Sequence, residues 1–185
     1  MEKKWGQYEL DEFQSKTLEK TDEVLKNNQS GAVIATPGSG KSVMIATAAL
    51  SNSQREDKPK IIIIQPTYDL LMQNLQALEN AGLADTNTTV SVYADKTKRP
   101  KTESGFMPKN RDLEGQIILT TPGAIKANWD KEDIGEKLEK ISKEQKVILL
   151  ADEAHRMGAQ ETQKICKTIG DHDNNAIFYS ATLFR

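Results

Sequence analysis

The stretch at residues 31–42 reads Gly-Ala-Val-Ile-Ala-Thr-Pro-Gly-Ser-Gly-Lys-Ser. A short apolar run leads into a Gly-rich turn, and a helical pattern follows from Lys41 onward. Such a turn presents several backbone N–H groups to phosphate oxygens, and the positive end of the following helix dipole adds to the attraction. The stretch therefore predicts a phosphate-binding loop between a strand and a helix.

Short apolar runs recur along the whole chain and alternate with helical patterns. Runs without polar alternation suit strands that are buried on both faces of a parallel sheet. The expected strands are 31–36, 60–66, 89–93, 116–121, 146–151 and 176–179. The expected helices are 10–26, 41–51, 68–81, 131–142 and 159–169. This alternation predicts an α/β fold with a doubly wound, mostly parallel sheet, whose ligands bind at the carboxyl ends of the strands.

Size and composition limit the possible partners and location. The 185 residues suit one domain, and 25 basic against 27 acidic residues give a net charge of -2, so any polyanion contact must be local. The single cysteine, Cys166, excludes an internal disulfide and indicates a reducing compartment. The N-terminus lacks the apolar core of a signal peptide, and no apolar run approaches the roughly 20 residues that cross a bilayer. We therefore expect a soluble cytoplasmic protein with no membrane partner.

Residues 95–115 are expected to form a long exposed loop, because basic residues stand there among Pro, Gly and Asn with almost no apolar periodicity. The basic residues are Lys96, Lys98, Arg99, Lys101, Lys109 and Arg111. Two interpretations remain open for this mildly cationic segment. It is either ordinary solvated surface, which is the commoner case, or a contact for nucleic acid.

A second motif, Val147-Ile-Leu-Leu-Ala-Asp-Glu-Ala-His, delivers two carboxylates at the end of an apolar strand. Together with the Gly-rich loop it predicts a site for ATP and Mg²⁺. We expect Asp152 and the Ser42 hydroxyl to hold Mg²⁺, Glu153 to orient and deprotonate the attacking water, and Lys41 to offset charge on the γ-phosphate. These roles make Glu153, Lys41 and Asp152 the candidate catalytic residues.

The remaining candidate ATP-binding residues of the loop are Thr36, Pro37, Gly38, Ser39 and Gly40. The strict phosphate-loop motif begins with Gly where this chain has Ala35. The prediction therefore depends on Gly40, Lys41 and Ser42, and on the strand-to-helix context.

With these residues, the chain resembles the first RecA-like domain of superfamily 2 helicases and translocases, the group of DEAD-box and DEAH-box proteins and restriction-enzyme motors. Asp152-Glu-Ala-His-Arg resembles motif II, and Ser180-Ala-Thr resembles motif III. Leu10-Asp-Glu-Phe-Gln resembles the adenine-recognition motif, with Gln14 as the adenine reader and Asp11 where an arginine is common. The resemblance implies an N-terminal helix with this motif at 1–30 and a RecA-like ATP-binding domain at 31–185.

Two aromatic residues upstream of Gln14 are open to two interpretations. Trp5 and Tyr8 either pack against the adenine, as an aromatic residue does in DEAD-box relatives, or anchor the first helix to the sheet.

The resemblance also implies contacts with DNA or RNA. Gln65-Pro-Thr-Tyr-Asp-Leu-Leu is similar to motif Ia and Thr121-Pro-Gly-Ala to motif Ib. The implied nucleic-acid-binding residues are Pro66, Thr67, Thr121 and Gly123. The residues implied to couple the ATP site to the nucleic acid are His155, Ser180 and Thr182.

Two positions depart from these motifs. Tyr68 and Ala124 stand where the consensus has arginine, so two charge-assisted phosphate contacts are missing. Tyr68 either stacks on a base or caps and packs a helix, and packing is the commoner case.

Motors of this superfamily bind ATP between two RecA-like domains, and the second domain supplies arginines that stabilise the transition state. The sequence reaches Arg185 soon after motif III, so we expect the second domain, a partner in cis, to lie outside this chain. An arginine finger is worth about 10³ to 10⁵ in rate, so little turnover is expected from the chain in isolation.

Two hypotheses about function follow. The first is the ATP-binding domain of a nucleic-acid-dependent ATPase, a helicase or a translocase that is an ATP hydrolase in its full-length form. The alternative is a nucleotide-dependent protein-binding module with little or no nucleic-acid activity, which the missing arginines and the acidic balance favour.

Overall fold

A seven-stranded parallel sheet forms the centre of the chain in the computed structural model, which describes residues 4–94, 97–129, 133–153, 159–170 and 174–181. The strands lie in the order β3-β9-β8-β4-β7-β5-β6, and every neighbouring pair is parallel. Their bounds are β3 (Gly31–Ile34), β4 (Lys60–Ile64), β5 (Val90–Tyr93), β6 (Lys109–Asn110), β7 (Ile117–Thr120), β8 (Val147–Asp152) and β9 (Asn175–Ser180).

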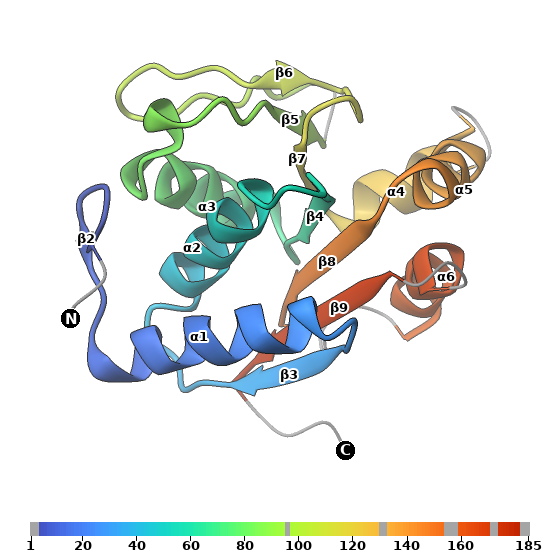
Figure 1. Cartoon of the computed structure of the whole chain (residues 1–185). Helices are drawn as coiled ribbons and strands as arrows, with labels where there is room; N and C mark the ends of the chain where they lie inside the picture. The colour runs from blue at the N-terminus through green and yellow to red at the C-terminus, as the bar shows by residue number, and fades with distance from the viewer. Residues whose placement is uncertain (1–3, 95–96, 130–132, 154–158, 171–173, 182–185) are drawn as a thin grey trace.

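Helices cover both faces of the sheet, as Figure 1 shows. One face carries α1 (Glu12–Lys26), α2 (Lys41–Ser53) and α3 (Tyr68–Asn80). The other carries α4 (Pro122–Asn128), α5 (Ile134–Glu144) and α6 (Ala159–Gly170). The predicted doubly wound α/β fold is therefore confirmed, and each expected strand and helix is present with its ends shifted by at most three residues.

The core consists of two clusters, one on each side of the sheet. Side chains alternate between the faces of a strand, so Ile63 of β4 joins the cluster under α1, α2 and α3, whereas Ile62 and Ile64 join the cluster under α4, α5 and α6. All five residues of β4 and all six of β8 are buried. The two central strands thus match the expectation of burial on both faces.

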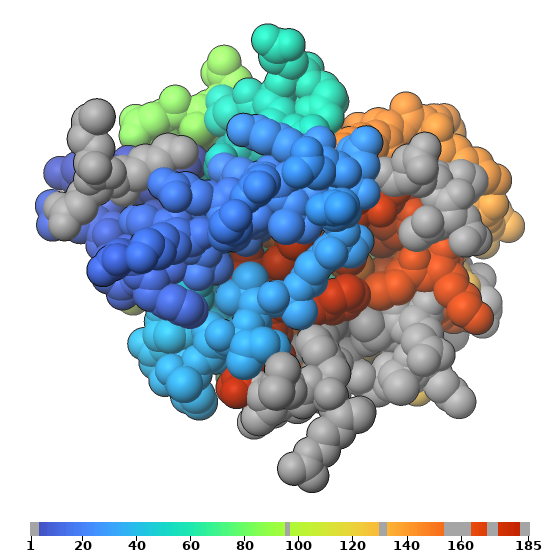
Figure 2. Space-filling view, turned by 60° about the horizontal axis from the view of Figure 1, so that its bottom comes forward, coloured from blue at the N-terminus to red at the C-terminus, as the bar shows by residue number. Residues whose placement is uncertain are grey.

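β3 departs from that expectation because it lies at the edge of the sheet, where it pairs with β9. Val33 packs against the first core cluster, but Ala32 and Ile34 are exposed, with 41% of Ile34 accessible to solvent. Figure 2 shows the segment of β3 and its following loop at the surface beside α1. The predicted phosphate-binding loop therefore follows an edge strand.

Several short elements were not expected from the sequence. β1 (Lys4–Trp5) and β2 (Tyr8–Glu9) form an antiparallel hairpin that packs on the end of α3, where the Gln7 N–H donates to the Asn80 carbonyl at 2.8 Å. A 3₁₀ turn, η1 (Leu83–Asp85), follows α3. α4 was also missed, although Thr121 followed by Pro122 is an N-cap and first-turn signature.

Residues 97–115 form the long exposed loop that the sequence predicts only in part. They contain β6, which pairs with β5, and several residues of this segment are buried: Pro100, Thr102, Pro108 and Gly115. The partly buried Phe106 packs against the first core cluster. The segment therefore folds back over the sheet and α3.

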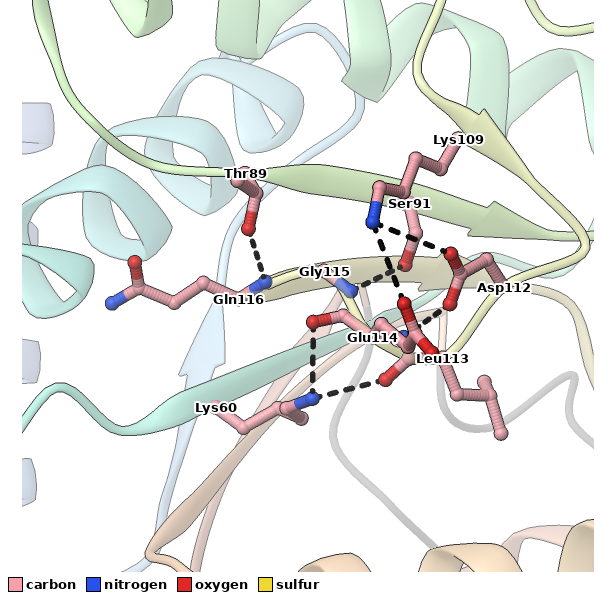
Figure 3. A network of polar contacts seen from close by, with 9 residues as sticks. All are labelled: Lys60, Thr89, Ser91, Lys109, Asp112, Leu113, Glu114, Gly115 and Gln116. Carbon is pink, nitrogen blue, oxygen red and sulfur yellow. Dashed lines mark hydrogen bonds and ion pairs between the residues drawn. The ribbon is translucent and has the colours of Figure 1, made fainter.

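Figure 3 shows how the end of this segment is attached to the sheet. Lys60 at the start of β4 donates from Nζ to the carbonyl oxygens of Leu113 at 2.9 Å and Glu114 at 3.4 Å. The Gly115 N–H donates to the Ser91 hydroxyl at 3.3 Å. Burial lowers the pKa of Lys60, which is opposed by the nearby carboxylates of Asp112 and Glu114. These partners are distant in sequence, so no local pattern predicts them.

Within the described part of the chain, no helix combines the length and the apolar character that a membrane span requires.

Candidate nucleotide-binding site

The loop between β3 and α2 has the backbone conformation that phosphate binding requires. Gly38 and Gly40 have φ angles of 81° and 79°, in the left-handed region that glycine adopts without a Cβ penalty. Gly40 is the N-cap of α2 and makes no side-chain capping bond. The first N–H groups of a 13-residue helix therefore face the loop without a side-chain acceptor at the cap.

Space and an unpaired polar atom both suit an anion at this loop. A Cβ placed on Gly38 meets no other atom within 4 Å, so the loop opens to solvent there. The Ser39 hydroxyl is buried and has no hydrogen-bond partner among the described residues. A phosphate group fits such a cradle, because it brings several strong acceptors.

The Gln14 side chain contacts the loop through a hydrogen bond. Its Nε2 donates to the Ser39 carbonyl at 3.2 Å, and a Cβ on Gly40 would lie 2.5 Å from that nitrogen. Its Oε1 accepts from the Asp11 N–H at 3.2 Å, while the Asp11 carboxylate accepts from the Gln14 N–H at 2.8 Å. This capping box positions the Gln14 side chain against the loop, and its role as adenine reader remains a prediction.

Ala35 occupies the position where the strict motif has glycine. It is only 3% exposed, and its N–H donates to the Ser180 carbonyl at 2.9 Å, which joins the start of the loop to the end of β9. Its carbonyl accepts from Lys41 Nζ at 3.3 Å. The methyl group of Ala35 is thus accommodated at this position. The Ala35 carbonyl oxygen holds the Lys41 ammonium group through a hydrogen bond.

The two carboxylates of the second motif lie at the end of β8, opposite Lys41. Glu153 follows the strand with a φ of 47°, an unusual conformation for a non-glycine residue, and its Oε1 lies 3.6 Å from Lys41 Nζ. The Glu153 N–H donates to Asp152 Oδ1 at 2.9 Å. The turn after the strand therefore aims one carboxylate at the lysine and holds the other beside it.

Asp152 is only 3% exposed, and this burial raises the pKa of its carboxyl group. The neighbouring charge of Glu153 raises the pKa further, whereas the Glu153 N–H, Lys41 and Gln65 act in the opposite direction. A cation next to such a buried carboxyl group stabilises its charged form.

The donor set matches the way proteins hold Mg²⁺ with a nucleotide. Mg²⁺ is usually bound by one or two carboxylates and by substrate phosphates, and it keeps several waters. Among the described residues, no group of three His, Cys, Asp or Glu side chains forms a metal cage. Asp152 and the half-buried Ser42 would supply the protein oxygens, at the end of the loop that faces the acids.

A cleft of about 800 Å³ opens above these groups. One wall holds the predicted residues Pro37, Gly38, Gly40, Lys41, Ser42, Asp152 and Glu153. The other wall comes from β2, α3 and the segment after β5, and includes Tyr8, Gln73, Gln76, Lys101, Thr102 and Glu103. Thr36, at the start of the loop, is exposed. The sequence identified the first wall but not the second, apart from Tyr8, because α3 and the 101–103 turn carry no motif that marks a site.

The two aromatic residues near the N-terminus differ in position. Trp5 is partly buried and packs against the first core cluster. Tyr8 also packs there, lines the cleft, and accepts a hydrogen bond on its hydroxyl from Asn80 Nδ2 at 3.4 Å. Both therefore help to anchor the hairpin, and Tyr8 is the one within reach of a ligand.

The residues implied to bind nucleic acid lie together at the carboxyl ends of β4 and β7. Thr67 is the N-cap of α3 and accepts from the Leu70 N–H at 3.3 Å. Thr121 is the N-cap of α4 and accepts from the Ala124 N–H at 3.3 Å. β4 and β7 are paired, so the two threonines share one edge of the sheet. Pro66 is half-buried there, and Gly123 is exposed with open space around its Cα.

Two cationic side chains that the motifs do not contain lie at this edge. Lys98 places its Nζ 4.4 Å from the centre of the Tyr68 ring, and the Arg111 guanidinium lies 5.8 Å from the centre of the Tyr93 ring. Tyr68 itself packs partly against the first core cluster. A cation from the 97–115 segment therefore stands over the residue that occupies the place of a consensus arginine.

Of the residues implied to couple the two sites, Ser180 is fully buried at the end of β9. His155 and Thr182 lie outside the described residues.

Fold and site together define an α/β domain with a Gly-rich loop after β3 and paired acids at the end of β8, which is separated from β3 by β9. Residues 11–185 match the model of the DEAD/DEAH box helicase family, and the chain belongs to that family. Its RecA-like fold and its resemblance to a first RecA-like domain are thereby confirmed. No curated protein matches the chain in sequence.

Solved structures with the same fold come from several kinds of motor. The Sulfolobus solfataricus SWI2/SNF2 ATPase core in complex with dsDNA matches 99% of this chain and 34% of its own length, with 15% identity and a TM-score of 0.67. A nuclease-deletion mutant of the Type ISP restriction-modification enzyme LlaGI, in complex with a DNA substrate mimic, matches 95% of this chain and 18% of its own length, with 19% identity and a TM-score of 0.64.

A variant of Dbp5 from S. cerevisiae, in a complex that includes ADP, matches 96% of this chain and 44% of its own length, with 20% identity and a TM-score of 0.63. The chain thus spans less than half the length of each of these three structures.

Replacing the buried acid should stabilise the chain in the absence of nucleotide. Because the pKa of Asp152 is raised in the folded state, the fold favours its protonated form, and that contribution is lost as pH rises through the raised pKa. Asp152→Asn should therefore raise Tm at pH 7, by about 2–4 °C for each kcal/mol gained. The difference from wild type should disappear as pH falls toward the usual value of 3.8.

Thermal unfolding of both proteins between pH 4 and 8 measures this. A variant that is less stable than wild type at pH 7 contradicts the prediction.

Proposed function

We propose that this chain is the Mg²⁺-ATP-binding domain of a nucleic-acid-dependent ATPase, a helicase or a translocase. The observation that carries the proposal is the arrangement of Lys41, Glu153 and buried Asp152 around an open Gly-rich loop at a helix N-terminus. Membership of the DEAD/DEAH box helicase family supports it. The ADP in the Dbp5 structure and the DNA in the other two structures agree with these ligand classes.

In the proposed site, the backbone N–H groups of 38–42 bind the phosphates and Lys41 neutralises charge on the terminal one. Mg²⁺ would supply further positive charge at the phosphate oxygens. Glu153 accepts the proton of the attacking water, and its ion pair with Lys41 keeps it aimed at the loop. We assign the Thr36, Ser39 and Gly40 backbone to phosphate contact and the Gln14 side chain to loop support and adenine recognition. Pro37, which has no N–H to donate, is assigned to the wall of the ATP-binding cleft.

The 185-residue chain is proposed to bind ATP well but to hydrolyse it slowly, because a second RecA-like domain in cis would supply the remaining positive charge. The complete protein would be an ATP hydrolase. The single cysteine of the 185-residue chain supports the proposal of a cytoplasmic setting.

The nucleic-acid edge is proposed to consist of Pro66, Thr67, Thr121 and Gly123. Lys98 adds the positive charge that Tyr68 does not carry, since its ammonium group is held over the Tyr68 ring beside Thr67. This edge lies on the same carboxyl side of the sheet as Asp152, so a strand bound there would be close to the nucleotide.

Lys41 and Glu153 variants test the nucleotide site. Lys41→Ala should weaken Mg²⁺-ATP binding by about 10-fold or more, because a charge-assisted phosphate contact is lost. Glu153→Gln should bind ATP about as well as wild type and lose at least about 10² of the remaining hydrolysis rate, because it removes the general base.

Titration with a fluorescent ATP analogue and single-turnover hydrolysis give the two quantities. Lys16→Ala, an exposed lysine on α1, is the matched control and should change neither. Wild-type affinity in Lys41→Ala would contradict the assigned phosphate site.

Lys98→Ala tests the nucleic-acid edge. The logarithm of the binding constant for a single strand falls linearly with the logarithm of the salt concentration. If Lys98 contacts one phosphate, the magnitude of this slope should decrease by about 0.7 in the variant. Fluorescence anisotropy of labelled DNA and RNA single strands at several salt concentrations, with an ATP analogue present, measures the slope.

Lys140→Ala on α5, away from this edge, is the control and should leave the slope unchanged. An unchanged slope in Lys98→Ala contradicts the assignment of Lys98. Nucleotide binding by wild type without any salt-dependent strand binding would favour the alternative, a nucleotide-dependent protein-binding module.

A further inference from the structure

Gln65 lies next to Asp152 on the face of the sheet that carries the nucleotide loop. In the β4–β8 ladder Ile64 pairs with Ala151, so the next residues along the two strands, Gln65 and Asp152, are neighbours. Ile63 and Leu150, two residues earlier in each strand, both join the core cluster under α2. Because side chains alternate along a strand, Gln65 and Asp152 point to this same face.

The Gln65 side chain is completely buried, yet it is not paired. Its exposed fraction is 0%, and neither its carboxamide oxygen nor its nitrogen has a hydrogen-bond partner of normal geometry among the described residues. The β4–β8 register nevertheless places this residue directly beside Asp152. The carboxamide therefore lies beside the Asp152 carboxylate without a hydrogen bond of normal geometry to it.

The backbone of Gln65 is fixed at the same time. Its N–H donates to the Thr120 carbonyl at 3.0 Å, which extends the β4–β7 pairing by one residue beyond β4. The main chain cannot easily move away, so a change in the position of the amide must come from rotation of the side chain.

An unpaired amide at this buried position lowers the stability of the nucleotide-free fold. The preceding residues of β4 are four isoleucines, and an apolar side chain would suit the same environment. Buried polar groups without partners are rare and reduce stability, and such groups concentrate at functional sites. Asp152, the neighbour of Gln65 in the β4–β8 ladder, is a group that would change when nucleotide binds, because it is the carboxylate proposed to hold Mg²⁺.

We propose that Gln65 is a positioning residue of the nucleotide site, whose carboxamide donates to the Asp152 carboxylate and orients it when Mg²⁺-nucleotide is bound. The proposal rests on the proposed ATP-binding function. Residues that orient a metal-binding carboxylate through a hydrogen bond commonly contribute about 10- to 100-fold to metal affinity.

The test is Gln65→Met, which keeps a similar length and removes the polar atoms. Two quantities are measured on the 185-residue chain: the Tm without nucleotide, and the affinity for a fluorescent ATP analogue in Mg²⁺ and in EDTA. We expect an unchanged or higher Tm, an affinity about 10-fold lower in Mg²⁺, and a change of less than about two-fold in EDTA.

Asn74→Leu is the matched control. Asn74 is also a fully buried amide with an unpaired oxygen, but it lies within α3 and is not part of the β4–β8 ladder that brings Gln65 beside Asp152. Its replacement should leave the ratio of the affinities in Mg²⁺ and EDTA unchanged.

Three results would overturn the proposal. A lower Tm for Gln65→Met, including loss of folding, would show that the amide stabilises the nucleotide-free fold. An unchanged ratio of the affinities in Mg²⁺ and EDTA would show that it does not act on the metal. If wild type itself shows no Mg²⁺-dependent nucleotide binding, the proposed function fails, and this outcome is distinct because it does not depend on the variant.

Discussion

Asp152 and Glu153 place two carboxylates side by side at the end of a buried strand, and Lys41 from the opposite loop faces them at 3.6 Å from Glu153. The burial raises the pKa of Asp152, so the charged form is held at a cost to the fold. A cation bound beside Asp152 would offset that cost, and the negative charge of a polyphosphate would be balanced by that cation and by Lys41. A ligand that brings a cation together with a polyphosphate would therefore suit the charges of this site.

The sheet topology makes this arrangement possible. The parallel strands β3, β8 and β4 all end at the same edge, so the loop after β3, the acids after β8 and the Gln65–Thr67 segment after β4 meet there. The Ala35 N–H bond to Ser180 and the Gln14 bond to Ser39 join β9 and α1 to the same loop. Movement of any one of these segments would change the distance between the loop and the acids.

The sequence predicted the features that depend on local patterns. Apolar runs marked the strands, and the Gly-rich loop and Asp152-Glu153 marked one wall of the cleft, because each needs only neighbouring residues to be recognised. The pattern of the sequence does not indicate α4, because this helix has only seven residues, begins with Pro122-Gly123, which is typical of turns, and buries only Ile125. The edge position of β3 was missed because an apolar run does not show how many strands lie beside it.

Long-range contacts account for the other differences. The 97–115 segment is attached through Lys60 and Ser91, and its polar composition gave no sign of that. Gln65 was visible in the motif-like stretch Gln65-Pro-Thr, but its relation to Asp152 depends on the pairing of β4 with β8. Sequence patterns located the acids, whereas only the register shows which side chain supports them.

Hydrogen exchange of the 185-residue chain with and without Mg²⁺-ATP tests the central claim most directly, because it reports on the loop and the acids separately. The account predicts slower amide exchange at Ser39–Ser42 and at Glu153 on addition of Mg²⁺-ATP, and a smaller effect when EDTA replaces Mg²⁺. Unchanged exchange at both segments under saturating nucleotide would contradict it.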